Sequence, residues 1–410
     1  MPANNKDELK RAVDLLDRAS RMKKSKDIYS VAWPEYEKIF KMVSESRTGE
    51  DKWRADLPDT WAFATIKTAQ AAFVDSQVKP IVIRHEDDPK SKSDDIQDLY
   101  ADIAEKGNLD LELYYARLDA FKLGNGYLQT VYTKDTRTIW EIKKFDPEKN
   151  EFEWKKKELD IFDDPKTVRV SPYLVLVDDL ARADWNTVRD AFIIEVCGRD
   201  TAEARYGHLV DFTKITNTTV LIDQMIPTTP ATVAETDGTG LRGTEFEGLQ
   251  KYHFFAPGFS WSDEVVEILH YWNVGIKTPS GALDSYEILI NGYPVQVDTK
   301  AKKSPIPYIH KQIPLTHIPY SPYSGDEHYA AGIIEIGRME ANAIKKYREM
   351  MVDRQKISLF TPAFIDLNDE LDQKTLALKP FGIYKTKGGK PSFPQIPGVT
   401  NADFALQDRF

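Results

Sequence analysis

The segment SPIPYIHKQIPLTHIPYSPYSG at residues 304–325 is followed by DEHYAAGIIEIGRMEANAIKKYREMMVDRQK at 326–356. The first segment carries five prolines, each of which removes a backbone donor and favours extended geometry in the residue before it. The second has no proline, and Ser324 stands three residues before Glu327 in the pattern of a capping box. We therefore predict an extended strap that leads into a helix over 326–356, which would be roughly 45 Å long. This pattern is typical of a scaffold and not of an active site.

The composition is that of a soluble globular protein. The chain has 410 residues, of which 41% are hydrophobic and 29% are charged, and this is enough material for two or three cores. It has no long uninterrupted apolar run, and residues 1–30 have a charged helical pattern that differs from a signal peptide. We therefore expect neither membrane insertion nor secretion. Cys197 is the only cysteine, and its place in the apolar run AFIIEVCG predicts an inert buried thiol.

The charge balance of the chain is acidic. It has 55 basic and 65 acidic residues, which give a net charge of −10. Proteins that bind nucleic acid over their surface are normally basic, because their affinity comes from neutralising phosphates. We therefore expect no tight, non-specific DNA binding by the whole surface. The balance is compatible with a channel through which nucleic acid slides without sticking, and equally with an acidic soluble enzyme.

The first third of the chain has helical periodicity. Apolar residues recur at helical spacing over 61–79, and two further helices are predicted at 95–107 and 109–124, each closed by a glycine. A short strand is predicted at 80–85, directly after the helix at 61–79, and a charged linker follows it. A short helix is also expected at 201–207. These elements provide the helical part of an α+β fold.

After the Gly-Asn-Gly at residues 124–126 the apolar period changes from helical to two. This change predicts an antiparallel sheet, with strands at 127–135, 138–146, 151–162, 167–178, 218–227, 265–274 and 286–297. Within the last of these, Asn291 and Gly292 form the strongest hairpin signal of the chain. Residues 228–248 are poor in apolar side chains and rich in threonine and glycine, which predicts a long mobile loop.

Searches for local catalytic and metal-binding motifs give no match. A glycine and Lys390 resemble part of a phosphate loop, but the next residue is a proline where the loop requires serine or threonine. Residues 366–370 resemble the start of a calcium loop, but Leu371 replaces the obligatory glycine. His310 and His317 have no carboxylate at ligand spacing. We therefore predict no catalytic residue, no metal site and no cofactor, although a site assembled from distant residues would leave no local motif.

The predicted helix at 326–356 carries a narrow apolar stripe among many charges. The members of the stripe recur at helical spacing, and they are Ile336, Met339, Ala343, Tyr347 and Met350. One interpretation is that the stripe packs on the core of its own chain. The charged residues, however, cover most of the circumference of the helix, more than a helix buried in its own domain would show. We favour the second interpretation, in which the stripe contacts copies of the same helix in a ring or bundle.

The order of these elements resembles the portal proteins, or head-to-tail connectors, of tailed bacteriophages. The resemblance is carried by the helix at 61–79 that leads into PIVIRH, by LDLELYYARLDAFKLGNGYLQTVY at 109–132, by RVSPYLVLVDDLARADW, and by the strap with its helix. It implies a wing of mixed helices and antiparallel sheet at 1–325, a first stem helix at 326–356 and a small α/β clip at 357–400. Residues 401–410 would begin a second stem helix, so we expect the chain to be truncated there.

The resemblance implies a structural role in the virion. The protein, made in the host cytoplasm, would form a homo-oligomeric ring, typically a dodecamer of twelve subunits, at one vertex of the capsid. Double-stranded DNA would pass through the ring during viral genome packaging and ejection, without sequence specificity. The implied partners are the terminase motor, head-completion or neck adaptor proteins, and the capsid and scaffold proteins.

The resemblance also implies roles for particular cations. Four basic residues of the stem-like helix would make transient phosphate contacts or pair with carboxylates of the adjacent subunit, and they are Lys345, Lys346, Arg348 and Arg354. In the clip, Lys385, Lys387 and Lys390 are candidates for docking a partner protein. Two other functions stay open from the residues alone. One is another structural protein of the virion neck or baseplate, and the other is an acidic intracellular hydrolase with a deep pocket of convergent titratable groups.

Overall fold

A computed structural model describes residues 5–43, 52–58, 60–75, 92–146, 151–178, 180–182, 184–215, 221, 265–275, 277–278, 281–282, 284–297, 305–308, 310–360, 363–366, 380 and 383–386. The chain divides into two compact units. The first unit consists of Met1–Pro34 and Gln70–Gly332, and the second of Glu35–Ala69 and Ile333–Phe410. Residues 35–69, which the sequence analysis placed with the wing, thus group with the region that follows residue 332.

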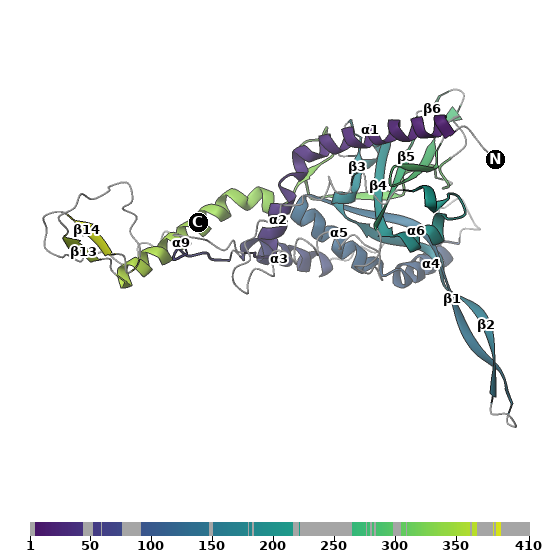
Figure 1. Ribbon diagram of the computed structural model, residues 1–410, viewed down its shortest axis with the longest axis horizontal. Coiled ribbons are helices and arrows are strands. Elements are labelled where there is room, and N and C mark those ends of the chain that lie inside the picture. The colour runs from purple at the N-terminus through teal and green to yellow at the C-terminus, as the bar shows by residue number, and fades with distance from the viewer. Residues whose placement is uncertain are drawn as a thin grey trace. The chain divides into compact units, whose positions relative to one another are not determined.

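The first unit is built around an antiparallel five-stranded sheet with the order β3-β4-β5-β8-β9 (Figure 1). Its strands are β3 (Val175–Val177), β4 (Asp190–Gly198), β5 (Val265–Asn273), β8 (Ser285–Ile290) and β9 (Tyr293–Gln296). The predicted hairpin between β8 and β9 is confirmed. Its turn residues Asn291 and Gly292 have φ angles of 46° and 77°, and this left-handed geometry is the one that an Asn-Gly pair adopts at low cost.

Helix α1 (Asn5–Ser30) covers one face of the five-stranded sheet. Its residues Ala12, Leu15, Ala19 and Met22 recur at helical spacing and pack on alternate side chains of the strands, such as Phe192. The intervening strand residues point to the other face. There, helix α6 (Arg199–Tyr206), predicted at 201–207, lies beside the fully buried Cys197. The predicted burial of this thiol is confirmed, and burial raises its pKa to about 12, which disfavours the reactive thiolate.

A three-stranded antiparallel sheet with the order β10-β1-β2 forms the next layer of the first unit. It consists of β1 (Asn125–Asp146), β2 (Glu151–Val170) and β10 (Leu315–Pro319), and Tyr127 and Leu315 pack between the two sheets. The strands predicted at 127–135 and 138–146 are one strand, because Thr136 and Arg137 between them pair with Asp160 and Leu159 of β2. The extra residue of the bulge at this point lies in β2. Beyond its base this hairpin projects from the unit as a two-stranded ribbon (Figure 1).

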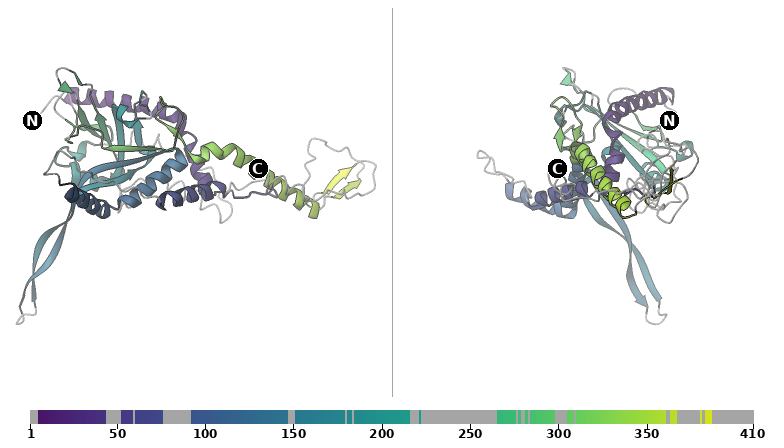
Figure 2. Two further views of the ribbon diagram at one scale, coloured as in Figure 1. Left: turned by 180° about the vertical axis from the view of Figure 1, so that it is seen from behind. Right: turned by 90° about the vertical axis from the view of Figure 1, so that its left-hand side faces the viewer.

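Helices lie on the outer side of the three-stranded sheet. Helix α4 (Ser93–Lys106) is followed by α5 (Leu109–Leu123), and α3 (Trp61–Asp75) begins in the second unit, so the three predicted helices are confirmed. Helix α5 ends at Gly124, whose φ is 87°, and a Cβ at that position would lie 1.7 Å from the carbonyl oxygen of Ala330. The views in Figure 2 place α1 on one side of the two sheets and α4 with α5 on the other.

Short elements complete the first unit. They are η2 (Pro172–Leu174), η3 (Trp185–Thr187), η4 (Phe212–Lys214), β6 (Lys277–Thr278), β7 (Gly281–Ala282), β11 (Ser321–Pro322) and β12 (Ala330–Ala331). Strands β10 and β11 confirm the extended geometry predicted for the proline-rich strap. Its backbone lies in a sheet, where prolines at strand ends are tolerated.

The second unit is dominated by the long helix α9 (Ile333–Leu359). The prediction that this helix begins at residue 326 is wrong. The Ser324 hydroxyl accepts a bond from the Asp326 backbone N–H at 3.2 Å within a turn, and β12 pairs with β11 before the helix begins. Tertiary pairing therefore overrides the local capping pattern. The helix also continues past the predicted end at residue 356, and at 27 residues it is about 40 Å long.

The remaining described parts of the second unit are small. Helix α2 (Trp33–Phe40) enters it from the first unit, and the parallel strands β13 (Ala363–Asp366) and β14 (Ile383–Thr386) pair within the region predicted as an α/β clip. The helices and antiparallel sheets confirm the α+β class. No helix in the described ranges is both long enough and apolar enough to cross a membrane. The strands predicted at 80–85 and 218–227, the loop at 228–248 and the helix start at 401–410 lie essentially outside the described residues.

Candidate functional site

One face of α9 is fixed to its own chain by polar contacts. Its side chains bind the segment 52–58, which precedes α3 in the second unit. Lys345 Nζ lies 3.5 Å from Asp56 Oδ1, Glu349 Oε1 accepts from the Leu57 N–H at 3.3 Å, Asp353 accepts from the Ala55 N–H, and Lys356 Nζ donates to the Trp53 carbonyl at 2.9 Å. The spacing of these α9 residues places them on one side of the helix. This face is therefore polar and oriented toward the chain's own backbone.

The N-terminal half of α9 is held on the same side by aromatic contacts. Gly337 lies under the Trp61 indole, and a Cβ there would come within 2.1 Å of the Trp61 Cη2 atom. The next residue, Arg338, pairs with Glu35 at 3.1 Å and lies over the Tyr36 ring. The sequence analysis missed these contacts. The signal was present, because a glycine inside a helical run costs about 1 kcal/mol relative to alanine and often marks a close approach.

The opposite face of α9 exposes the predicted apolar stripe. Ile336 is 62% exposed, Met339 85% and Met350 68%, and Ala343 is exposed as well. Only Tyr347 is half-buried. The first interpretation, that the stripe packs on the core of its own chain, is therefore wrong for these four residues. Helix α9 buries Ile333, Ile334 and Ala341, but along its middle part it turns polar side chains toward segment 52–58 and exposes the apolar stripe.

The structure separates the four cations that the sequence analysis grouped on this helix. Lys345 pairs with Asp56 and Glu349 of its own chain, and its contact with DNA or an adjacent subunit stays a prediction. Lys346 and Arg348 are exposed, and Arg354 is half-buried. Of the three predicted docking lysines, Lys385 lies in β14, and Lys387 and Lys390 lie outside the described residues.

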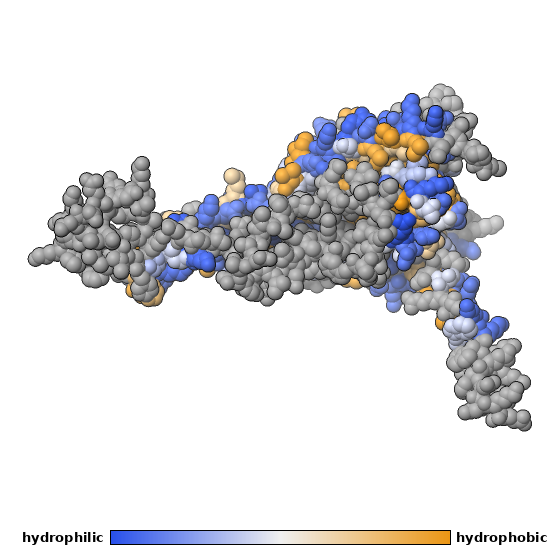
Figure 3. All heavy atoms as spheres, in the orientation of Figure 1, coloured by the Kyte–Doolittle hydropathy of each residue, from blue (hydrophilic) through white to orange (hydrophobic). Residues whose placement is uncertain are grey.

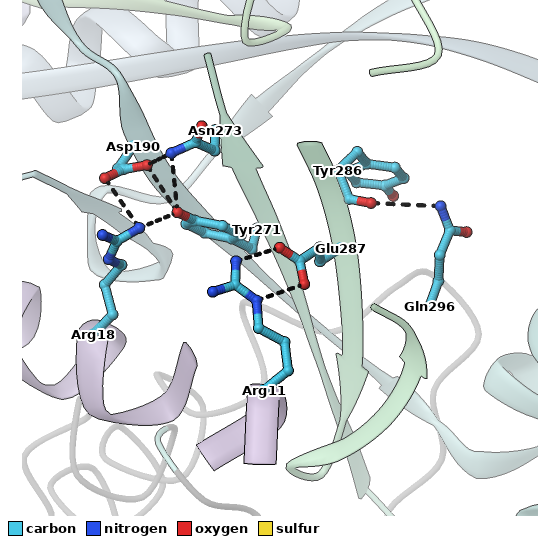
Figure 4. Close-up of polar contacts among 8 residues, drawn as sticks. All are labelled: Arg11, Arg18, Asp190, Tyr271, Asn273, Tyr286, Glu287 and Gln296. Atoms are coloured by element: carbon cyan, nitrogen blue, oxygen red, sulfur yellow. Dashed lines mark hydrogen bonds and ion pairs between the residues drawn. The ribbon is translucent and has the colours of Figure 1, made fainter. Parts of the chain in front are cut away.

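A second polar cluster joins α1 to the five-stranded sheet (Figure 4). The Arg11 guanidinium donates to both carboxylate oxygens of the fully buried Glu287, from Nε at 3.1 Å and from a terminal nitrogen at 2.6 Å. Two turns further along the helix, Arg18 donates to the Tyr271 hydroxyl and lies 3.3 Å from Asp190. The hydrogen bond with Glu287 raises the pKa of Arg11. These groups neutralise one another, so the cluster attaches α1 to the sheet and offers no free acid or base.

A cavity of about 670 Å³ lies between the base of the ribbon and the strap in the first unit. Trp185, Tyr308 and the two histidines of the strap are among its lining residues. Burial lowers the pKa of His317 to about 2, so its imidazole is neutral, and its ring centroid lies 4.2 Å from that of the tilted His328 ring. The described lining includes no carboxylate, and nowhere do the described residues gather three or more metal-binding side chains. The titratable side chains of the described lining are the two histidines of the strap and the tyrosines Tyr132 and Tyr308.

Neither the protein-family models nor the curated protein sequences that were compared with this chain give a match. The functional argument therefore depends on the residues and contacts described above, and most of all on the two faces of α9.

Proposed function

We propose that this chain is the subunit of a portal ring, which conducts double-stranded DNA at one vertex of a bacteriophage capsid. The observation that carries the proposal is the exposed stripe of Ile336, Met339, Ala343 and Met350 on α9. Along about 21 Å of helix, apolar side chains face away from the chain's own contacts. Removing such a stripe from water is favourable by about 25 cal/mol per Å² of apolar surface. A neighbouring copy of the same helix provides a matching surface.

The charge of the chain suits a channel for DNA better than a DNA-binding surface. The net charge is −10, and the polar face of α9 uses Lys345 and Lys356 in contacts within the chain. On the exposed side of α9, Lys346 and Arg348 are cations that passing phosphates can reach. Each stable phosphate contact would release counterions and slow the movement of DNA, so few exposed cations favour transport. In this proposal the terminase, the neck adaptor and the capsid proteins bind the ring from outside.

The first test is the oligomeric state of the purified protein. We expect multi-angle light scattering to give a mass many times 46.9 kDa, and electron microscopy to show rings with an open centre. Met339→Glu places a charge in the stripe and should shift the protein to monomers, because the charge would be desolvated in the interface. Gln355→Glu, at an exposed position of the same helix, is the matched control and should assemble like the wild type.

Two outcomes contradict the proposal. A wild-type protein that stays monomeric at high concentration refutes the ring. Rings in which α9 lies on the outer rim, away from the channel, would instead assign the chain to another structural protein of the virion neck or baseplate. DNA binding gives an independent measurement, because a channel of this charge should bind duplex DNA weakly at physiological salt.

A further inference from the structure

Helix α4 presents an apolar face that the chain itself does not cover. Every residue of this 14-residue helix is exposed or half-buried, and Ile96, Leu99 and Tyr100 are exposed apolar residues on one side. An isolated helix of this length is marginal in water, and most helical stability in proteins comes from packing of the apolar face. Helix α4 packs on α5 and β2, but among the described residues nothing buries this apolar side, which has the composition of an interface.

The charges of α4 indicate what kind of partner covers it. The helix has five acidic residues and one basic residue, which gives a net charge of −4. Asp95 and Asp102 lie beside the apolar face, and all five carboxylates are in exposed residues. DNA is excluded as a partner by this charge, and so is an anionic membrane surface. The complement of α4 is a surface that combines exposed apolar side chains with basic ones.

The C-terminal half of α1 has that combination. From residue 18 to residue 31, which directly follows the end of α1, the exposed residues are Arg21, Lys24, Ile28 and Val31, and their spacing of three and four residues places them on one side. Ile28 is 78% exposed and Val31 77%, and neither Arg21 nor Lys24 makes an ion pair with a described residue. Figure 3 shows apolar side chains at the surface along α1. The two exposed cations and two exposed aliphatic side chains match the acidic and apolar groups of α4.

The two surfaces face in opposite directions on the same unit. Helix α1 is the outer layer on the five-stranded sheet, and α4 lies with α5 on the outer side of the three-stranded sheet (Figures 1 and 2). Complementary surfaces on opposite sides of one molecule produce head-to-tail contacts between copies. Such contacts close into a ring when the rotation between copies allows it.

We propose that α4 of one copy docks on the C-terminal half of α1 of the next copy, with Ile96, Leu99 and Tyr100 against Ile28 and Val31. Arg21 and Lys24 then meet the carboxylates beside the apolar face of α4. This inference depends on the proposed ring and adds a second contact between neighbouring subunits, at a distance in the sequence from α9. It also gives the ring a direction, because each subunit uses one surface on each side.

Charge reversal tests the contact. The first variant, Asp95→Lys with Asp102→Lys, reverses the charge beside the apolar face of α4. The second, Arg21→Glu with Lys24→Glu, reverses the charge on the C-terminal half of α1. Each is expected to raise the protein concentration needed for half-assembly by about tenfold, because attraction becomes repulsion across the interface. A third variant carries all four substitutions and should restore assembly to near the wild-type concentration. Lys6→Glu with Lys10→Glu, at exposed positions near the start of α1, is the matched control and should assemble normally.

The outcomes separate this contact from the ring itself. If both reversals assemble like the wild type, or if the combined variant does not recover, the pairing of α4 with α1 is refuted while the ring stands. A wild-type protein that never assembles refutes the ring. Circular dichroism shows whether reversed α4 still folds, and if it does not, Leu99→Ser replaces it as the variant that must weaken assembly. Recovery in the combined variant cannot come from misfolding and supports the contact directly.

Discussion

Replacing Arg11 by methionine should destabilise the first unit by about 3 kcal/mol. The substitution keeps the aliphatic part of the side chain on α1 and removes the guanidinium that donates twice to Glu287 (Figure 4). Glu287 is 0% exposed, so its carboxylate would remain buried without this cation. Breaking a buried ion pair from one side costs about 3–5 kcal/mol. We expect the lower end of that range, because Arg11 is itself partly exposed and water can reach the site after the substitution.

The assay is urea unfolding at pH 7, followed by circular dichroism. With a slope of about 3 kcal/mol/M, a loss of about 3 kcal/mol lowers the unfolding midpoint by about 1 M. Lys10→Met on the same helix is the control, and as an exposed substitution it should change stability by less than about 0.5 kcal/mol. Combining Arg11→Met with Glu287→Leu should recover most of the loss, because no buried charge is left unpaired. If Arg11→Met costs no more than Lys10→Met, or if the double variant is less stable than the single one, the reasoning is refuted.

Three further predictions concern buried groups. Lys26→Met removes the Nζ that donates to three carbonyls at 2.7, 2.7 and 2.9 Å, and should cost about 2–3 kcal/mol in urea unfolding. Gly337→Ala should lower the melting temperature by several degrees through the clash with Trp61, unless Trp61→Ala is added. Burial lowers the pKa of His328 to about 4. Between about pH 6.5 and pH 4 this histidine is therefore protonated in the unfolded chain but not in the folded one, and the free energy of unfolding falls as the pH is lowered through this range. His328→Gln should flatten this slope, which denaturation at pH 7 and pH 5 measures.

Features that depend only on residues adjacent in the sequence were predictable. The turn at Asn291 and Gly292 requires left-handed backbone, which this pair adopts easily, and the end of α5 at Gly124 has the same cause. The start of α9 was predicted wrongly for a physical reason. The pattern from Ser324 to Glu327 can begin a helix, but the following residues instead pair as β12 with β11, which lies earlier in the strap. A local capping bond of about 1 kcal/mol does not compete with that packing.

The sequence predicted which residues of α9 form the apolar stripe, but not which way the stripe faces. The direction of the stripe is the observation on which the functional argument depends. Spacing alone identified the apolar stripe that includes Ile336 and Met350, but spacing cannot say whether a stripe faces its own chain or another. That is decided by the segment 52–58, which contributes backbone N–H groups, a backbone carbonyl and the Asp56 carboxylate, and so selects the polar side of the helix. Because those polar groups form their hydrogen bonds within the chain, the polar side of the helix faces segment 52–58 and the stripe faces away from it. The stripe is exposed to water in one chain. In the proposed ring, association with another copy removes it from water.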